Sequence, residues 1–457
     1  MEKMTTKEIA KAVFGKTDVD VDVYDCEIDN RRVKPKSLFI CIKGERFDGH
    51  DFAESAVEAG AVAVMCEKKL NLPKNISQIL VENTSEAFLH LANYYRGKFT
   101  FPFIGVTGSV GKTTVKDMIH TLLSKKNKAL KTEGNLNNEV GLPRTLMNID
   151  SECEYAVIEM GMNHRGEIST LSLISQVDIG VINNIGTSHI GNLGSKENIM
   201  SAKLEILDGM KKGSPLVLNG DDKLLSSYKN DDYKVVFFGI ENQKADYRAE
   251  NIHFEDEFTS FDLVCSQGRY NIEIPLFGKH SVLNALAAFS VIGELKLNID
   301  DYKDGLVDFL STGMREKHIK IGDIMFIEDC YNASPDSVEA SINTLASKKN
   351  HRKIFVFGDM LELGEKSKEA HINVGLRAAK KEIDMVLCIG IYSELTVAAA
   401  KANGVKISKS FDSKTKLADF LYENLQSGDV VTFKASRGMK LEEVAKKVYE
   451  KLEAEKK

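Results

Sequence analysis

Short apolar runs alternate with amphipathic stretches along most of this chain. Apolar runs that are nearly continuous, each followed by a helical pattern, predict parallel sheets with helices on both faces. Near the amino terminus, the expected strands are residues 37–42, 61–66 and 79–82, and the expected helices are 51–61 and 85–97. This part of the chain is therefore expected to form a small α/β unit.

The alternation restarts after residue 98. Its expected apolar strands lie at 103–106, 155–161 and 178–184. Three later segments alternate polar and apolar residues with a period of two, which predicts an antiparallel appendage. These segments lie at 247–254, 258–265 and 270–277. An apolar helix over 281–295 is expected to close this unit near Thr312.

A third alternation begins at about Gly313. Its expected strands lie at 324–330, 353–359, 385–390 and 430–436. Strands and helices in this order indicate an open sheet of the nucleotide-binding type. The predicted organisation is three α/β domains, at residues 1–98, 99–312 and 313–457.

The composition agrees with a globular protein of this size. The chain has 457 residues, of which 43% are hydrophobic, and roughly 150 residues are typical of one domain. The net charge is -6 and no dense basic stripe is present, so nucleic acid is not an expected partner. The 7 cysteines include no CxxC pair, which indicates neither a zinc site nor a disulfide framework.

The amino terminus carries charges where a signal peptide needs an apolar core. No run approaches the roughly 20 apolar residues of a membrane span. We predict a cytoplasmic, monomeric protein without a membrane span.

A glycine-rich segment connects the strand at 103–106 to a predicted helix. Consecutive backbone N–H groups at a helix start form a cradle for an anion. Lys112 is expected to reach the β and γ phosphates of a nucleotide, and the Thr113 hydroxyl to bind magnesium. The usual motif has glycine where this chain has Val106. The expected phosphate-binding residues are Gly108, Ser109, Val110, Gly111, Lys112, Thr113 and Thr114.

The identity of the nucleotide follows in part from a motif that the chain lacks. The Asn/Thr-Lys-x-Asp element that recognises guanine is absent from the sequence, so ATP is favoured over GTP. At this point a simple ATPase, a kinase, and a glycine-rich turn with a solvated lysine all stay open.

Further polar residues stand at predicted strand ends and in the segments that follow them. Residues 132–143 are typical of a tight turn, on the sheet edge where open α/β sheets bind ligands. Glu159 ends a buried strand, where a carboxylate needs a partner such as a hard cation. His189 and Lys203 follow the next strand. Each of these residues, taken alone, is more often structural.

Taken together, these segments resemble the Mur ligase family, whose members build the peptide of the bacterial cell wall. The resemblance covers essentially the whole chain, and its motifs occur in the expected order. They are residues 132–143, 159–168, 278–288, 329–337, 358–371 and 434–444. The sequences DCYNASPDS and GDMLELG are particularly specific, and sister ligases have Ala-His-x-Pro where this chain has Asn332-Ala-Ser-Pro335.

The resemblance implies a fold, two cofactors and a set of roles. The implied fold is a central P-loop, parallel-sheet domain of the ATPase type, flanked by a UDP-sugar-binding α/β domain and a carboxy-terminal Rossmann-like α/β domain. ATP and Mg²⁺ are the implied cofactors. The implied catalytic residues are Lys112, Glu159, His189 and Lys203, and the implied magnesium site consists of Thr113, Glu159, His189 and Lys203. The implied ATP contacts outside the loop are Asn284 and Asn332, beside adenine, and Arg315 and Asp329.

The resemblance also implies that Lys203 is carbamylated. An unmodified ammonium would repel Mg²⁺, whereas a carbamate supplies the hard oxygens that this ion prefers.

Residues 27–52 resemble the UDP-sugar-binding domain of the family. Asn30 stands where the family usually has Ser or Thr, and Cys330 and Ser334 also depart from the usual Ser and Asn. The implied substrate contacts are Asn30, Arg31, Lys43, Gly44, Arg46 and Asp48, with Asn135, Asn137 and Asn138 in the central domain. Lys434, Ser436 and Arg437 are expected near substrate in the cleft.

Within the family, the resemblance is to members that add D-alanyl-D-alanine to UDP-N-acetylmuramoyl-tripeptide through an acyl phosphate. These two compounds are thus the implied partners. One alternative is another Mur-type or folylpolyglutamate-type ligase, which shares the central domain. A second alternative is a non-catalytic ATP-binding scaffold, which needs no cluster of Glu159, His189 and Lys203.

Overall fold

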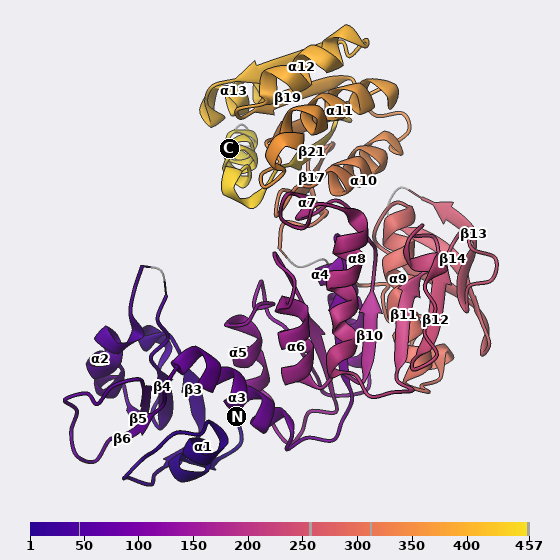
Figure 1. Cartoon of the computed structure of the whole chain (residues 1–457). Coiled ribbons are helices and arrows are strands. Elements are labelled where there is room, and N and C mark those ends of the chain that lie inside the picture. The colour runs from indigo at the N-terminus through magenta and orange to yellow at the C-terminus, as the bar shows by residue number, and fades with distance from the viewer. Residues whose placement is uncertain (45, 256–257, 311–312, 455–457) are drawn as a thin grey trace.

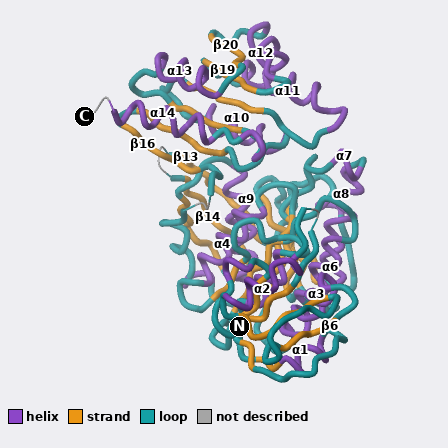
Figure 2. Tube along the Cα trace, turned by 90° about the vertical axis from the view of Figure 1, so that its left-hand side faces the viewer, coloured by secondary structure: helices purple, strands orange, loops and turns teal. Residues whose placement is uncertain are grey.

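The computed structural model describes residues 1–44, 46–255, 258–310 and 313–454. Three sheets larger than a hairpin divide the molecule into three α/β domains, which Figure 1 shows from indigo to yellow. The third domain lies above the central one, and the two termini lie at different ends of the molecule (Figure 2). The boundary expected near Thr312 falls outside the described residues.

The first domain has a sheet of 4 parallel strands in the order β3-β4-β5-β6. A separate pair, β1-β2, is antiparallel. The elements are β1 (Met4–Thr5), α1 (Thr6–Ala12), β2 (Asp22–Val23), β3 (Asp25–Glu27), β4 (Ser37–Ile40), α2 (Ala53–Glu58), β5 (Ala61–Cys66), β6 (Ser77–Leu80) and α3 (Thr84–Arg96). The strands expected from the apolar runs correspond to β4, β5 and β6.

The central domain begins with a strand, a loop and a helix, as the glycine-rich segment predicts. Its first elements are β7 (Phe103–Thr107), α4 (Lys112–Leu123), β8 (Ala129–Lys131), α5 (Gly141–Met147), β9 (Tyr155–Glu159), α6 (Glu167–Ser175) and β10 (Ile179–Ile182). The elements that follow are α7 (Ile190–Leu193), α8 (Lys196–Leu204), β11 (Pro215–Asn219), β12 (Lys234–Gly239), β13 (Tyr247–Phe254), β14 (Thr259–Cys265), β15 (Gly268–Ile274) and α9 (Lys279–Glu294).

All 9 of these strands form one sheet, in the order β15-β14-β13-β12-β11-β10-β7-β9-β8. The three strands β13, β14 and β15 are antiparallel to one another, as expected. They are not a separate appendage, because β13 pairs in parallel with β12 and continues the sheet. A period-two pattern gives the two faces of a strand but not its partner, so the sequence could not show this continuity.

Helices cover both faces of the central sheet. Along β9, Ala156 and Ile158 pack into the cluster with α5, α6 and α8, whereas Val157 packs into the cluster with α4 and α9. This alternation is the reason that the strand is apolar from Ala156 to Ile158.

The third domain has 6 strands in the order β16-β17-β21-β18-β19-β20, all parallel except β16. The strands are β16 (Lys317–Ile321), β17 (Ile324–Asp329), β18 (Lys353–Gly358), β19 (Met385–Ile389), β20 (Ile407–Phe411) and β21 (Val430–Lys434). The helices are α10 (Pro335–Ala346), α11 (Ser367–Lys380), α12 (Ser393–Ala402), α13 (Lys414–Asn424) and α14 (Glu442–Ala454). The sequence did not predict β16 or β20, which carry more polar residues.

The buried cores do not follow the three sheets. One cluster of buried side chains runs from the first domain into the central domain and includes residues of α3, α5 and α6. The third domain has clusters of its own on the two faces of its sheet. None of the helices in the described ranges is both long and apolar enough to cross a membrane.

Candidate active site

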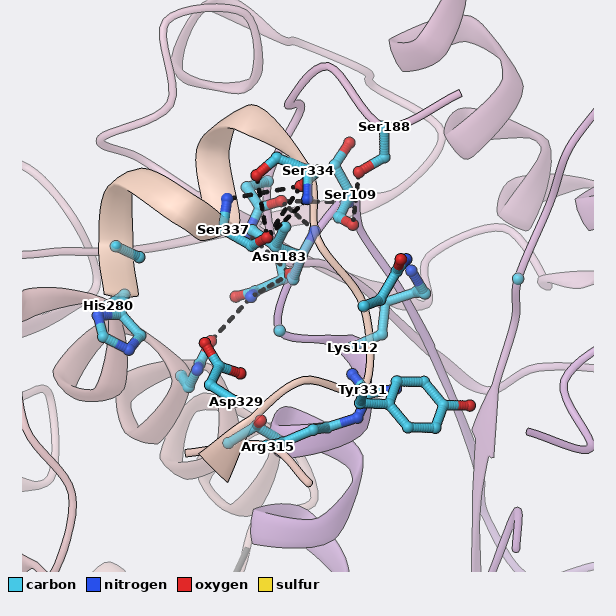
Figure 3. A pocket seen from close by; sticks show the side chains of 18 of the residues that line it. Ser109, Lys112, Asn183, Ser188, His280, Arg315, Asp329, Tyr331, Ser334 and Ser337 are labelled. Carbon is cyan, nitrogen blue, oxygen red and sulfur yellow. Dashed lines mark hydrogen bonds between the residues drawn. The ribbon is translucent and has the colours of Figure 1, made fainter. Parts of the chain in front are cut away.

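A cavity of about 390 Å³ lies between the central and third domains (Figure 3). Its size lies within the range of small-molecule sites, roughly 300–1,000 Å³. Lys112, Glu159 and His189 of the central domain all line it, and Arg315 and Asp329 line it from the third-domain side. The three central residues thus share one cavity rather than facing separate surfaces.

The phosphate loop connects β7 to α4. Gly111 precedes α4 with a φ of 80°, and a Cβ there would lie 2.7 Å from Asn284 Oδ1 and 2.5 Å from Asn183 Nδ2. Only glycine combines this backbone conformation with such close neighbours. Lys112, the first residue of the helix, donates a hydrogen bond to the Gly108 carbonyl at 2.9 Å. Burial lowers the pKa of Lys112, Glu159 opposes this shift, and Arg315 adds to it.

Two asparagines after β10 hold the phosphate loop in place. The Asn184 side-chain oxygen accepts hydrogen bonds from the N–H groups of Ser109 at 3.1 Å and Val110 at 2.9 Å. Asn183 donates to the Val110 carbonyl and to Asn284 Oδ1. Neither residue was among those expected from the sequence. Their place directly after an apolar strand, beside the expected ligand edge, was the available signal.

Glu159 ends β9 and is buried among hydrogen-bond donors. Its Oε2 accepts from the Thr113 hydroxyl at 2.8 Å, and its Oε1 accepts from Asn137 Nδ2 at 2.8 Å. The Lys116 ammonium lies 3.8 Å from Oε2 and donates to the Thr132 carbonyl. Lys116 was not among the residues expected from the sequence, although it follows Lys112 by one helical turn and thus shares its side of α4.

His189 stands at the start of α7 with a φ of 62°. Its Nδ1 is buried and has no hydrogen-bond partner among the described residues. Burial, followed by the nearby Lys112, Lys203 and His164, lowers the pKa of His189 to about 4. The imidazole is therefore neutral near pH 7 and can bind a cation through a ring nitrogen.

Lys203 lies in the last turn of α8 and is 2% exposed. Burial, and then the charge of Lys112, lower its pKa well below the ordinary value. The side chain is close enough to influence His189 as well, but it is not among the described residues that line the cavity.

The expected nucleotide contacts outside the loop lie together. Asn284 of α9 and Asn332 line the cavity, as do Arg315 and Asp329. The Arg315 guanidinium lies 4.0 Å from the centre of the Tyr331 ring. Figure 3 shows Lys112, Arg315, Asp329 and Tyr331 around one space.

The three residues expected near substrate, at and just after the end of β21, have different positions. Lys434 lines the cavity and forms an ion pair with Asp329 at 2.7 Å. Burial raises the pKa of Asp329, and the Lys434 ammonium opposes this rise. Ser436 is buried and joins two third-domain loops, whereas Arg437 is exposed and pairs with Glu442.

The implied UDP-sugar residues lie in the first domain, away from this cavity. Asn30 donates to the Ser55 hydroxyl at 2.9 Å, and Arg31 pairs with Asp29 at 2.8 Å. Asp48 accepts from the His50 N–H and is 2.6 Å from His50 Nδ1. The remaining three residues are exposed: Lys43, Gly44 and Arg46. In contrast, Asn135, Asn137 and Asn138 line the cavity.

The donor groups fit a nucleotide with magnesium better than a metal held by the protein alone. Thr113 and Glu159 offer hard oxygens, and His189 Nδ1, which has no hydrogen-bond partner among the described residues, offers a nitrogen ligand in the same cavity. Among the described residues, no three His, Cys, Asp or Glu side chains are placed to hold a metal together. An ion at this position would thus need further oxygens, such as those of phosphates.

Three family models match consecutive parts of the chain. They are the Mur ligase family catalytic domain over residues 22–96, the Mur ligase middle domain over 106–292 and the Mur ligase glutamate ligase domain over 314–437. A UDP-N-acetylmuramoyl-tripeptide–D-alanyl-D-alanine ligase of Bacillus subtilis is 39% identical over 98% of this chain and 99% of its own. The chain belongs to the Mur ligase family.

Solved structures of the Mur ligase family agree with this fold. A MurF structure from Acinetobacter baumannii superposes with a TM-score of 0.91 at 29% identity, over 98% of this chain and 99% of the other. MurF ligase from Thermotoga maritima, solved in complex with ADP, gives a TM-score of 0.83 at 30% identity, over 95% and 99%. The expected three-domain α/β fold is thereby confirmed.

Proposed function

We propose that this Mur ligase joins D-alanyl-D-alanine to UDP-N-acetylmuramoyl-tripeptide, with ATP and Mg²⁺, during synthesis of peptidoglycan precursors. The observation that carries the proposal is the single cavity shared by Lys112, Glu159 and His189, in a chain whose full-length relatives bear this activity in their names. We further propose that the enzyme acts in the cytoplasm as a monomer.

Formation of the amide bond requires an activated carboxylate, because an oxide anion is a poor leaving group. In the proposed first step, a carboxylate oxygen of the tripeptide attacks the γ-phosphorus of ATP, and ADP leaves. The amine of D-alanyl-D-alanine then attacks the carbonyl carbon of the acyl phosphate, phosphate leaves, and the amine loses a proton. Phosphoryl transfer of this kind depends on position and charge neutralisation more than on covalent help from the protein.

Cations in the cavity would reduce the electrostatic repulsion between the tripeptide carboxylate and the triphosphate of ATP. We assign Lys112 to the phosphates and Thr113 and Glu159 to a magnesium ion, with His189 beside a second one. Magnesium, when bound, supplies positive charge that neutralises the phosphates. The hydrogen bond between Thr113 and Glu159 supports this assignment, since it brings two oxygen ligands to one point.

We assign a carbamate to Lys203. Carbamate formation requires a neutral amine, which attacks carbon dioxide and loses a proton. The lowered pKa of buried Lys203 favours that amine at neutral pH. A carbamate would also place a negative charge near Lys112 and His189.

The remaining roles divide between the two outer domains. We propose that Asn284, Asn332, Arg315 and Asp329 contact the nucleotide, since all line the cavity. The UDP end of the substrate would bind the first domain, through Asn30, Arg31, Lys43, Gly44, Arg46 and Asp48. Its peptide end would then reach Asn135, Asn137 and Asn138 at the cavity wall.

The two alternatives account for less of the site. A non-catalytic ATP-binding scaffold would need the loop and an adenine pocket, but not a neutral histidine beside a buried carboxylate and a buried lysine. A folylpolyglutamate synthase from Mycobacterium tuberculosis shares the fold, with a TM-score of 0.61 at 16% identity. The match covers 94% of that synthase but only 80% of this chain. The ligase of Bacillus subtilis, in contrast, matches 98% of this chain.

The decisive experiment measures phosphate release with ATP, magnesium and D-alanyl-D-alanine, adding one UDP-N-acetylmuramoyl-tripeptide at a time. Tripeptides that end in L-lysine or in diaminopimelate are tested separately. We expect release that depends on both the dipeptide and one of the tripeptides, with the ligated product visible by mass spectrometry. Release without either substrate would favour an ATPase, and no release with any combination would remove the ligase proposal.

A further inference from the structure

The loop between β10 and α7 contacts the phosphate loop of its own domain. The Gly186 N–H donates to the Ser109 hydroxyl at 2.8 Å. The Ser188 hydroxyl donates to the Ser109 carbonyl at 3.2 Å. A shift of the phosphate loop would therefore also shift residues 186–188. These residues directly precede His189.

The same loop contacts the third domain through one carboxylate. Asp336 Oδ2 accepts from the Thr187 N–H at 2.7 Å and from the Thr187 hydroxyl at 2.8 Å. The two residues are 149 positions apart in the sequence and belong to different domains. Hydrogen bonds to an ionised acceptor are roughly twice as strong as neutral ones, so this contact is a strong link across the boundary.

The third domain holds Asp336 rigidly. Asp336 is the second residue of α10, after a capping box formed by Ser334 and Ser337 and a proline at the first position. A carboxylate in the first turn is also favoured by the helix dipole. The Asp336 carboxylate is therefore already ordered within the third domain before it accepts the hydrogen bonds from Thr187.

A second third-domain loop reaches the other end of the same segment. The Glu362 carboxylate lies 3.7 Å from His189 Nδ1, and a Cβ on Gly191 would be 3.3 Å from the Glu362 carbonyl. Ser436 joins the two third-domain loops, because its hydroxyl accepts from the Leu361 N–H at 2.9 Å and donates to the Ala333 carbonyl at 3.3 Å. The His189 segment thus lies against two third-domain loops that Ser436 joins, and the hydrogen bonds to it come from Asp336.

We propose that Asp336 is a positioning residue that links the third domain to the phosphate loop through Thr187 and Ser109. It lies outside the cavity lining and does not contact the nucleotide site itself. By holding Thr187, it keeps His189 in the cavity and keeps the third-domain residues opposite the phosphate loop. This inference rests on the proposed function, because an ATP-dependent ligase needs both domains around its substrates.

The first test measures ligation kinetics in a double-mutant cycle with D336A, T187V and the double variant. D336A removes both hydrogen bonds, and we expect kcat/KM for ATP to fall about 10-fold to 100-fold. T187V removes one bond and should lose about 3-fold to 10-fold, whereas T187S, which retains the hydroxyl, should recover most of this loss. The double variant should be no worse than D336A, since Thr187 acts through Asp336.

The matched control is E339A. Glu339 lies on the same helix, one turn later, is exposed, and pairs with Arg377 inside the third domain. We expect wild-type kinetics from it. Wild-type kcat/KM in both D336A and T187V would overturn the proposal, and so would losses that simply add in the double variant. If D336A fails to fold, T187V and T187S still decide the question.

The second test does not require ligation. Small-angle scattering of the full chain should give a larger radius of gyration for D336A and T187V than for the wild type and E339A, because the third domain is held less firmly. An unchanged radius in both variants would overturn the proposal even if the wild type proved to be a ligase. If the wild type does not ligate but the radius changes as expected, the proposed function fails and the interdomain link stands.

Discussion

The central domain meets the first domain mainly through buried apolar side chains and the third domain mainly through polar ones, although Phe277 stacks on His318. Against the first domain, Leu91 and Tyr95 of α3 belong to a buried cluster that continues into α5 and α6. Against the third domain, Thr187 meets Asp336, and His280 lies 3.2 Å from Glu316. Buried apolar area resists separation, whereas polar groups at a boundary can exchange their partners for water when it opens.

The polar groups at the first boundary strengthen its rigidity. Tyr95 donates to the Ile149 carbonyl at 2.6 Å, and Arg96 Nε donates to the Ser175 carbonyl at 2.7 Å. The Arg96 guanidinium also lies 3.5 Å from the centre of the Phe103 ring. These residues are buried and satisfied, so separation of the two domains would expose both apolar surface and unpaired polar atoms. The cavity lies at the other boundary, where substrates can enter.

The largest effect is expected from charge removal inside the polar boundary. Lys112→Ala or Glu159→Ala should lower ligation by at least about 10³-fold, because each removes a charge or metal ligand that we propose acts at the transferred phosphoryl group. Circular dichroism and thermal unfolding should show an intact fold. Lys125→Ala, an exposed lysine just beyond the end of α4, is the control and should ligate normally. Wild-type turnover in either site variant would remove this cavity as the active site.

The next effect tests the apolar boundary. Leu91 is 0% exposed in the shared cluster, and Leu91→Ala should reduce the free energy of unfolding by about 2–5 kcal/mol. Urea titration should show the first and central domains losing structure together, while the folded fraction still ligates. Leu173→Ala, on α6 and 50% exposed, should change stability by less than about 0.5 kcal/mol. Separate transitions for the two domains would contradict the shared core.

A smaller effect is expected at the edge of the cavity. Lys203→Ala should lower turnover about 100-fold, and short-chain carboxylates such as acetate should restore part of it by replacing the proposed carbamate oxygens. Lys196→Ala, at the exposed start of the same helix, should keep full turnover, and added carboxylate should not change that turnover. Failure of rescue at every concentration would count against the carbamate but not against the ligase.

The smallest effect is a pH dependence confined to the polar boundary. Burial opposes the charge on His280, but Glu316 outweighs it and raises the pKa of His280 above 6.5. The histidine therefore stabilises the fold below pH 6.5, and this contribution is lost as the pH rises through the raised value. We expect less than about 1 kcal/mol, measured as the change in unfolding free energy between pH 6 and pH 8.

His280→Gln should remove this pH dependence. His253→Gln, at an exposed position of β13, should leave it unchanged. A slope of the opposite sign in the wild type would mean that burial, rather than Glu316, controls the histidine.

The local pattern of the chain determined much of the fold and part of the site. Strand β5 lies over the expected residues, because an uninterrupted apolar run between polar segments has few other stable arrangements. Lys112 and Glu159, which line the cavity, were selected for a similar reason, since a glycine-rich loop and a carboxylate at a strand end are local signals. Strand β20 was missed because its residues 407–411 are largely polar and pair at an edge of the sheet.

Only the tertiary structure decided which residues act together. Asn184 reaches Ser109 and Val110 across 74 or 75 positions, and Asp336 reaches Thr187 across 149. Neither pair has a local pattern, because contacts between distant segments depend on the order of strands in the sheet and on the placement of domains. The sequence thus determined most of the elements and their chemistry. Only the packing of the domains determined that the boundary between the first and central domains is mainly apolar, and that the boundary between the central and third domains is mainly polar and holds the cavity.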